Sequence, residues 1–439
     1  MARRLFGTDG VRGVAGELLT PELAVALGRA AVEQAGARRV LLVRDPRESG
    51  PMLEAALAAG AAAAGAEVLL GGVLPTPAAP LLLRRHGVDL AAVISASHNP
   101  FRDNGIKFFA ADGFKLSDDD ELAVERRMEA RGAAPDAMGA VQPLEGGRED
   151  YLAALGERFA SLDLTGRRVL LDCANGATSP VAPEAFRRLG AQVEVLADAP
   201  DGRNINEGCG STHVGLLAEA MAHGGHDVGF AFDGDGDRVL AVDRRGAVVD
   251  GDELVALAAR HLRSADRLPG DGVVVTVMTN FGFHAAMRAL GVQVAVTQVG
   301  DRYVLEELRR RGWALGGEQS GHVIDLAFNR SGDGLATALL TLEALAGSDL
   351  AERDAMEKLP QRLVGVRVAD REATMADPRV TEAIDREGAA LEGRGRVLVR
   401  PSGTEPLVRV MVEAPAAQEA DAVCARLVTV VQEAAGTGS

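Results

Sequence analysis

Three aspartates in the middle of the chain are spaced to bind a divalent cation. Asp233, Asp235 and Asp237 alternate with glycines directly after the apolar run VGFAF. Hard carboxylate oxygens on a tight, glycine-rich loop suit Mg²⁺, which leaves its other coordination positions to water or phosphate oxygens. A calcium EF-hand is excluded, because Arg238 and Arg244 stand where that loop needs Gly and Glu. The alternative is a solvated acidic turn, in which three close carboxylates would repel each other without a cation.

A serine that could act as nucleophile or phosphate carrier ends another apolar run, ISASHNP. Ser95 and Ser97 would share one face of a strand, but only Ser97 lies at its end, beside His98 and Asn99. Taken alone, Ser-His-Asn is more often a turn or a helix cap than a catalytic site.

Lysine is rare in this chain, which makes each lysine slightly more notable. Of 47 basic residues only Lys107, Lys115 and Lys358 are lysines, and 47 − 3 = 44 are arginines. Lys107 follows Ser97 in DNGIKFF, at a turn that leads into a short strand. It is either a solvated lysine or a group for acid–base work or phosphate contact.

Two loops combine glycine, hydroxyl side chains and arginine, which is a pattern that binds anions. Residues 6–13 form one of them, with Arg12 able to grip a phosphate in two places; a plain N-terminal turn explains this segment equally well. The second loop is flanked by two arginines and reads either as an anion cradle or as a bare hairpin turn. Its candidate residues are Arg400, Ser402, Gly403, Thr404 and Arg409.

A further loop, GGEQSGH, offers groups that hold hydroxyl-rich ligands such as sugars. Glu318 supplies a carboxylate, Ser320 a hydroxyl and His322 an imidazole. A lone loop histidine is, however, more often merely exposed.

These loops follow a unit that the chain repeats three times. Each copy alternates apolar runs with helical segments as β-α-β-α-β, which predicts mostly parallel, buried strands in α/β layers. The copies begin near residues 39, 169 and 272, and their third strands end at Ser97, at Asp233 and at Gly317. Because open α/β sheets bind ligands at the carboxyl ends of their strands, we expect the three loops to face one shared cleft.

The pattern changes near residues 360–368. An alternating strand, a helix over 378–391, two strands around PSGTEP and a final helix predict a small α+β domain.

Composition narrows the function classes. The 439 residues are 47% hydrophobic and 25% charged, which is typical of a folded protein of about three domains. A net charge of −16 argues against nucleic acid or anionic membrane as partner. Three scattered cysteines favour a reducing compartment, and neither a signal peptide nor a transmembrane segment is expected. We therefore expect a cytoplasmic protein.

Five segments together resemble the α-D-phosphohexomutase superfamily and, within it, the phosphoglucosamine mutases. They are FGTDGVRG, ISASHNPFRDNGIKFF, FDGDGDR, GGEQSGH and RPSGTEPLVRVMVE, in the family's order along the whole chain. The resemblance implies three related α/β domains with mixed, mostly parallel sheets and a smaller C-terminal α+β domain around a central cleft. The implied domains are residues 1–150 with the phosphoserine loop, 151–250 with the metal loop, 251–365 with the sugar loop and 366–439 with the phosphate loop.

The resemblance also implies roles for the candidate residues. Ser97 carries a phosphate, and a phosphoserine oxygen joins the three aspartates in holding one Mg²⁺ per active site. Lys107 and His322 are the two candidates for proton transfer, and His98 beside Ser97 completes the catalytic set. Arg12 and Arg238 lie near the reacting phosphate, and Glu318 and Ser320 bind sugar hydroxyls. The loop with Arg400, Ser402, Gly403, Thr404 and Arg409 binds the distal phosphate.

The implied reaction interconverts glucosamine 6-phosphate and glucosamine 1-phosphate through a bisphosphate intermediate. Glucosamine or glucose 1,6-bisphosphate would serve as intermediate or activator. The product would feed UDP-N-acetylglucosamine and cell-wall precursor synthesis. The C-terminal domain would act as a lid that excludes water, and a homodimer is the family-based expectation.

Three other functions stay open. Phosphomannomutase or phosphoglucomutase activity is the same chemistry on a sugar that carries a hydroxyl instead of the amine. A metal-dependent phosphatase would use water as acceptor. A phosphosugar sensor would bind without turnover, although binding alone needs neither a phosphoserine nor a metal.

Overall fold

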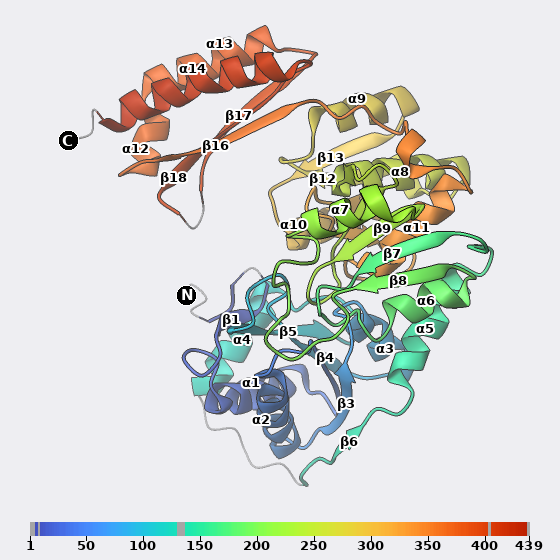
Figure 1. The fold of residues 1–439 in the computed structure, drawn as a ribbon. Helices are drawn as coiled ribbons and strands as arrows, with labels where there is room; N and C mark the ends of the chain where they lie inside the picture. Colours follow the sequence, from blue (N-terminus) through green and yellow to red (C-terminus); the bar gives the residue numbers. More distant parts are fainter. Residues whose placement is uncertain (1–4, 8, 130–136, 403–404, 437–439) are drawn as a thin grey trace. The chain divides into compact units, whose positions relative to one another are not determined.

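The computed structural model describes residues 5–7, 9–129, 137–402 and 405–436 (Figure 1). The chain forms two compact units. The first unit contains Met1–Val277 and Val292–Arg353, and the second contains Met278–Gly291 and Asp354–Ser439. Three mixed α/β sheets lie in the first unit, and a small antiparallel sheet with helices makes up most of the second. The expected fold class is therefore confirmed.

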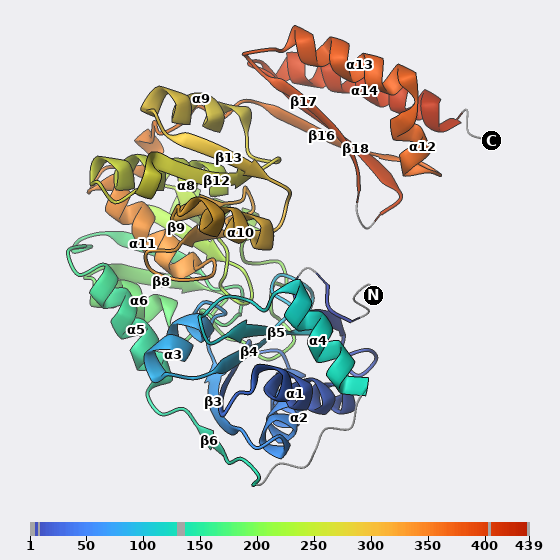
Figure 2. The ribbon, with the colours of Figure 1, turned by 180° about the vertical axis from the view of Figure 1, so that it is seen from behind.

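The first sheet has six strands in the order β1-β5-β4-β2-β3-β6. Strands β4, β2 and β3 are parallel, whereas β5 runs antiparallel to β4. The apolar core on one face joins this sheet to α1, α2 and α4, and α3 covers the other face (Figure 2). The elements are β1 (Val11–Val14), α1 (Pro21–Ala35), β2 (Arg39–Arg44), α2 (Gly50–Ala63), β3 (Glu67–Val73), α3 (Ala78–His86), β4 (Leu90–Ile94), β5 (Asp103–Ala110), α4 (Asp118–Glu129) and β6 (Val141–Pro143).

The second sheet has five strands in the order β11-β10-β9-β7-β8. Its parallel centre is β9, β7 and β8, and β10 folds back antiparallel to β9. The elements are α5 (Gly147–Arg158), β7 (Arg168–Asp172), α6 (Ala182–Arg188), β8 (Gln192–Leu196), α7 (Gly215–Gly224), β9 (Val228–Phe232), β10 (Val239–Asp243) and β11 (Val248–Val249).

The third sheet has four strands in the order β13-β12-β14-β15. Strands β13, β12 and β14 are parallel, and β15 is antiparallel to β14. The elements are α8 (Gly251–Ser264), β12 (Gly272–Thr276), β13 (Gln293–Thr297), α10 (Asp301–Arg311), β14 (Leu315–Gly317), β15 (Val323–Asp325) and α11 (Gly334–Leu345), with short 3₁₀ turns at Pro269–Asp271 and Leu350–Glu352.

All three sheets contain four strands in the same order, which confirms the threefold repeat. In each sheet the first strand of the unit lies at the centre, between the second and the third. A further strand then folds back against the third, namely β5, β10 or β15. Each polar loop predicted at the end of a third strand thus connects that strand to an antiparallel neighbour in the same sheet.

The second unit contains the three-stranded antiparallel sheet β16-β18-β17, packed against helices through an apolar core. Its elements are α9 (Phe281–Leu290), β16 (Gln361–Arg367), α12 (Arg371–Ala376), α13 (Pro378–Ala390), β17 (Arg396–Pro401), β18 (Leu407–Glu413) and α14 (Ala417–Gly436). This small α+β domain agrees with the change of pattern near residues 360–368.

Helix starts follow capping chemistry. Asp250 and Glu253 form a reciprocal capping box at the start of α8. Helix α10 begins at Asp301, whose carboxylate in the first turn is favourable beside the positive helix N-terminus. This start brings Asp301 to the candidate site.

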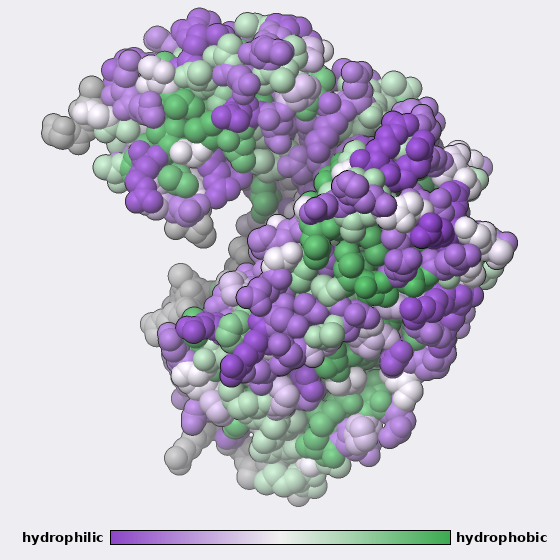
Figure 3. Space-filling model, viewed as in Figure 1, coloured by the Kyte–Doolittle hydropathy of each residue, from purple (hydrophilic) through white to green (hydrophobic). Residues whose placement is uncertain are grey.

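Hydrophilic residues cover most of the surface seen in Figure 3, and apolar residues occupy smaller patches. Among the described residues, no helix is both long and apolar enough to cross a membrane.

Candidate active site

Ser97 lies in the loop after β4 with a strained backbone and an oriented side chain. Its φ angle of 51° is in the left-handed region, which is unfavourable for a residue with a Cβ. Ser97 is buried, and its Oγ donates to Asp233 Oδ2 at 2.5 Å. Nδ1 of His98 lies 3.3 Å from the same Oγ. The serine predicted on the first repeat thus contacts the aspartate predicted on the second.

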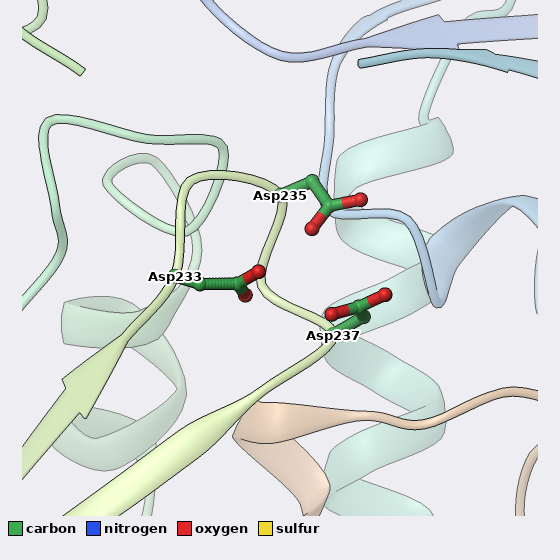
Figure 4. Close-up of side chains that lie close together, drawn as sticks. All are labelled: Asp233, Asp235 and Asp237. Atoms are coloured by element: carbon green, nitrogen blue, oxygen red, sulfur yellow. The ribbon is translucent and has the colours of Figure 1, made fainter. Parts of the chain in front are cut away.

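The three aspartates turn their carboxylates toward one another in the loop between β9 and β10 (Figure 4). One oxygen from each of Asp233, Asp235 and Asp237 lies within 4.8 Å of the others, and all three residues are buried. A Cβ added to Gly234 would lie 2.6 Å from the carbonyl oxygen of Ser97. The glycine is therefore required for the close approach of the two loops.

The chemistry of this triad fits a bound cation. Burial first, and then the charges of Asp237 and Asp235, raise the pKa of Asp233 well above its ordinary value. One oxygen each of Asp235 and Asp237 is buried without a hydrogen-bond donor. Unpartnered buried oxygens and mutual repulsion are both relieved by a divalent cation, so the residues present fit Mg²⁺.

Lys107 lies on β5 and faces the triad. Its Nζ lies 2.9 Å from Asp235 Oδ2, 3.8 Å from Asp237 Oδ2 and 3.7 Å from Asp9 Oδ2. Burial lowers the pKa of Lys107, but the three carboxylates outweigh burial and raise it above its ordinary value. We call Ser97, Lys107 and the three aspartates the serine–aspartate cluster.

His322 brings the third repeat to the same place. Its Nδ1 lies 3.6 Å from Asp237 Oδ1, and its Nε2 lies 3.9 Å from Asp301 Oδ2. Burial lowers the pKa of His322, but Asp237, Asp301 and Glu318 together outweigh burial and raise it. Glu318 on the same loop is buried and accepts a hydrogen bond from the Gly300 amide at 2.9 Å.

A pocket of about 520 Å³ opens beside these groups. Of the predicted residues it is lined by Arg12, Ser97, His98, Asp237, Arg238, Glu318 and His322. Burial and the charges of Arg238 and Arg12 lower the pKa of His98, so this imidazole is neutral near pH 7. The pocket therefore combines cationic groups for a phosphate with carboxylates for a cation or a sugar.

Sequence reasoning missed four polar residues around this pocket. Lys115 Nζ contacts Asp9 Oδ1 and lies 2.5 Å from Asp301 Oδ2, which joins the first and third sheets. Thr76 Oγ1 donates to Asp235 Oδ2 at 2.5 Å. Asp9 lay inside the quoted FGTDGVRG segment, and Lys115 was one of only three lysines. Those two signals were visible, whereas Thr76 and Asp301 carried none.

Other predicted residues do not line this pocket. Ser320 is exposed and lies outside the pocket lining. Arg400, Ser402 and Arg409 belong to the second unit. Gly403 and Thr404 lie outside the described residues.

Within the second unit, β17 and β18 place two arginines face to face. Arg400 is the direct cross-strand partner of Arg409. Partial burial and then the charge of Arg409 lower the pKa of Arg400. Arg409 pairs with Glu405, while no described carboxylate forms an ion pair with Arg400. Like charges opposite each other destabilise a sheet, and an anion bound to both arginines would relieve this repulsion. We call Arg400 and Arg409 on β17 and β18 the arginine hairpin.

Comparison with known proteins assigns the family. Models of the phosphoglucomutase/phosphomannomutase family match α/β/α domain I at residues 3–134, domain II at 149–246, domain III at 250–363 and the C-terminal domain at 363–430. A crystal structure of a phosphoglucomutase/phosphomannomutase family protein from Burkholderia thailandensis superposes with a TM-score of 0.82 at 26% identity, covering 99% of this chain and 98% of that one. The chain belongs to the phosphoglucomutase/phosphomannomutase family.

Relatives at higher identity narrow this class. Phosphoglucosamine mutases are 51% identical in Desulforudis audaxviator, over 98% of both chains, and 51% identical in Moorella thermoacetica, over 97% of this chain and 98% of that one. An N-acetylphosphoglucosamine mutase of Aspergillus fumigatus, in complex with GlcNAc-6P and magnesium, shares the fold with a TM-score of 0.72 at 20% identity, over 98% of this chain and 96% of that one. Within its family the chain groups with the phosphoglucosamine mutases, which are isomerases.

Proposed function

We propose that this enzyme interconverts glucosamine 6-phosphate and glucosamine 1-phosphate through a phosphorylated Ser97. The observation that carries the proposal is the 2.5 Å contact between Ser97 Oγ and Asp233 Oδ2 inside a buried triad of aspartates. A serine fixed against a cation-binding loop and beside Arg12 and Arg238 is placed to carry a phosphoryl group. The 51% identical phosphoglucosamine mutases support the choice of sugar.

Asp233, Asp235, Asp237 and a phosphoserine oxygen would hold one Mg²⁺ per active site. When bound, the ion would supply a positive charge that offsets the charge on the transferring phosphoryl group. Arg12, Arg238 and Lys107 supply further positive charge from the protein.

The proposed reaction consists of two phosphoryl transfers. The Oγ–P bond of Ser97 breaks as the free sugar hydroxyl forms an O–P bond and loses its proton, which yields a sugar bisphosphate. The bisphosphate turns over, its other phosphate returns to Ser97 Oγ, and the vacated sugar oxygen regains a proton. Glucosamine or glucose 1,6-bisphosphate would serve as intermediate or activator.

Lys107 and His322 remain the two candidates for the proton, because each contacts the aspartate loop. Replacing each by Ala and measuring turnover in both directions separates them. The general base in one direction is the residue whose replacement lowers turnover more in that direction. Its replacement should also abolish the dependence of that turnover on pH.

The arginine hairpin would bind the phosphate that is not being transferred. Arg400 and Arg409 would supply charge, and Ser402, Gly403 and Thr404, which lie between them in the sequence, would contribute to the same phosphate site. Glu318 and Ser320 would bind sugar hydroxyls. A cytoplasmic location and a homodimer stay predictions.

A side-by-side assay tests the proposed function. Purified phosphorylated protein is given glucosamine, glucose and mannose 6-phosphates, and kcat/KM is compared. The highest value for the amino sugar is expected. A higher kcat/KM for glucose 6-phosphate or mannose 6-phosphate would instead favour phosphoglucomutase or phosphomannomutase activity, which are the activities in the family's description. Steady release of inorganic phosphate without isomerisation would reveal a phosphatase.

A further inference from the structure

The Ser97 loop is held from within the protein by Arg47, a residue outside the pocket lining. Arg47 is completely buried after β2. Its Nη2 donates to the carbonyl oxygens of Ser97 at 2.8 Å and Asn99 at 2.9 Å. Its Nη1 donates to the carbonyl oxygens of Asp103, at 3.0 Å, and Pro100. One guanidinium thus binds four carbonyls of a single loop.

Asp45 compensates the buried charge and extends the contact to the serine amide. Arg47 Nε donates to Asp45 Oδ2 at 2.8 Å, and Ser95 Oγ donates to the same oxygen at 2.6 Å. The amide of Ser97 in turn donates to Ser95 Oγ at 2.9 Å. Both the amide and the carbonyl of Ser97 are therefore fixed through Arg47 and Asp45.

Asn206 grips the same loop from the second repeat. Its Nδ2 donates to the carbonyl oxygens of Ser97 at 3.0 Å and Asn99 at 3.3 Å. Asn206 has a φ of 59° and is buried near Gly234 of the aspartate loop. This amide thus lies beside Gly234 of the aspartate loop while it donates to the loop that carries Ser97.

The strained backbone of Ser97 needs such support. A left-handed non-glycine residue persists only where its surroundings over-determine it. Here the amide and the carbonyl of Ser97 are both hydrogen-bonded to side chains, and that carbonyl has two donors. Rotation of this backbone would carry Oγ away from Asp233.

We propose that Arg47 and Asn206 are positioning residues for phosphoryl transfer, which hold the Ser97 backbone so that Oγ faces the aspartate loop. The inference rests on the proposed function. Neither residue lines the pocket; each acts through Ser97. Their loss should lower the rate of transfer more than it weakens substrate binding.

Arg47→Lys and Asn206→Gly test this inference. Lysine keeps the charge opposite Asp45 but cannot reach four carbonyls from one ammonium. Glycine tolerates a φ of 59° while removing the amide. Arg158→Lys is the matched control, because Arg158 is largely buried, pairs with Asp325 and Glu343, and does not line the pocket.

Turnover is measured per phosphorylated site, with the phosphorylated fraction taken from intact mass, below each variant's melting temperature. We expect kcat to fall on the order of 10²-fold in both variants, with KM within about 3-fold of wild type. The control should keep both parameters. A purely structural role would lower thermal stability but leave kcat per phosphorylated site unchanged, and that result would overturn the inference.

If the Arg47→Lys variant does not fold, the Asn206→Gly variant alone tests the positioning role. An Asn206→Gly protein that is folded, phosphorylated and as active as wild type would refute the positioning role. Failure of the proposed function gives a different result, in which wild-type protein itself does not interconvert the sugar phosphates.

Discussion

The serine–aspartate cluster and the arginine hairpin handle charge in opposite ways. In the cluster, Lys107 Nζ lies within 4 Å of Asp235 and Asp237, and these side chains are buried. In the hairpin, Arg400 and Arg409 face each other across two strands. The ammonium of Lys107 offsets part of the negative charge of the three aspartates and a bound cation would offset the rest, whereas the hairpin gathers only positive charges.

This difference separates two kinds of site. Groups fixed before the substrate arrives need little reorganisation during phosphoryl transfer, which is how preorganised sites lower a barrier. Unbalanced arginines instead gain free energy when an anion binds between them. The cluster is therefore expected to set kcat and the hairpin to set KM.

Removal of the serine should have the largest effect. Ser97→Ala leaves no oxygen to carry the phosphoryl group, so turnover should fall by at least about 10³-fold. Coupled assay of glucosamine 1-phosphate formation measures it, and intact mass should show the loss of one phosphate. Turnover near the wild-type rate would remove the phosphoserine from the mechanism.

Removal of the cation should rank second. Asp235→Asn keeps the acceptor for Thr76 but removes a negative charge that faces Lys107. We expect Mg²⁺ affinity and kcat each to fall on the order of 10²-fold. Calorimetric titration of Mg²⁺ and a thermal shift with and without the ion measure this directly. Unchanged Mg²⁺ affinity would show that the ion binds elsewhere.

Most of this cluster could be predicted from the sequence because its signals are local. Short apolar runs mark the third strand of each repeat, and the polar loops at Ser97, Asp233 and Gly317 follow directly. The rule that ligands bind at the carboxyl ends of parallel strands then brings the loops together. The geometry agrees, since Ser97 contacts Asp233 and His322 lies near Asp237.

The contacts of the missed residues join parts of the chain that are far apart in the sequence. Lys115 and Asp301 are 186 residues apart and meet only in the fold. Arg47 was hidden for a different reason, since one arginine among 44 gives no hint that it is completely buried. Burial of a charged side chain depends on partners that local periodicity does not reveal.

Loss of an arginine from the hairpin should act on binding. Arg400→Ala should raise KM for the sugar phosphate about 10- to 100-fold, because a charge-assisted hydrogen bond contributes about 1.5–3 kcal/mol. Mg²⁺ affinity should stay at its wild-type value, because the ion's ligands belong to the other unit. Equal losses of phosphate and Mg²⁺ affinity would contradict the division between the two regions.

The smallest effect should come from Arg409. Its Nη2 pairs with Glu405 Oε2 at 2.9 Å, and its side chain is 37% exposed, so part of its charge is already balanced and screened. Arg409→Ala should therefore raise KM by only about 3-fold, in line with the small free energies of exposed ion pairs.

The same substitution should strengthen the hairpin without ligand. Loss of the opposing charge lets the pKa of Arg400 rise toward its ordinary value and removes a repulsive cross-strand pair. Thermal unfolding without phosphate should then show Arg409→Ala at least as stable as wild type, while added inorganic phosphate should stabilise wild type more than the variant. A variant that is less stable than wild type and gains as much from phosphate would mean that the two arginines do not repel each other. The positive charge of the hairpin would then be balanced within the hairpin, unlike the negative charge of the serine–aspartate cluster.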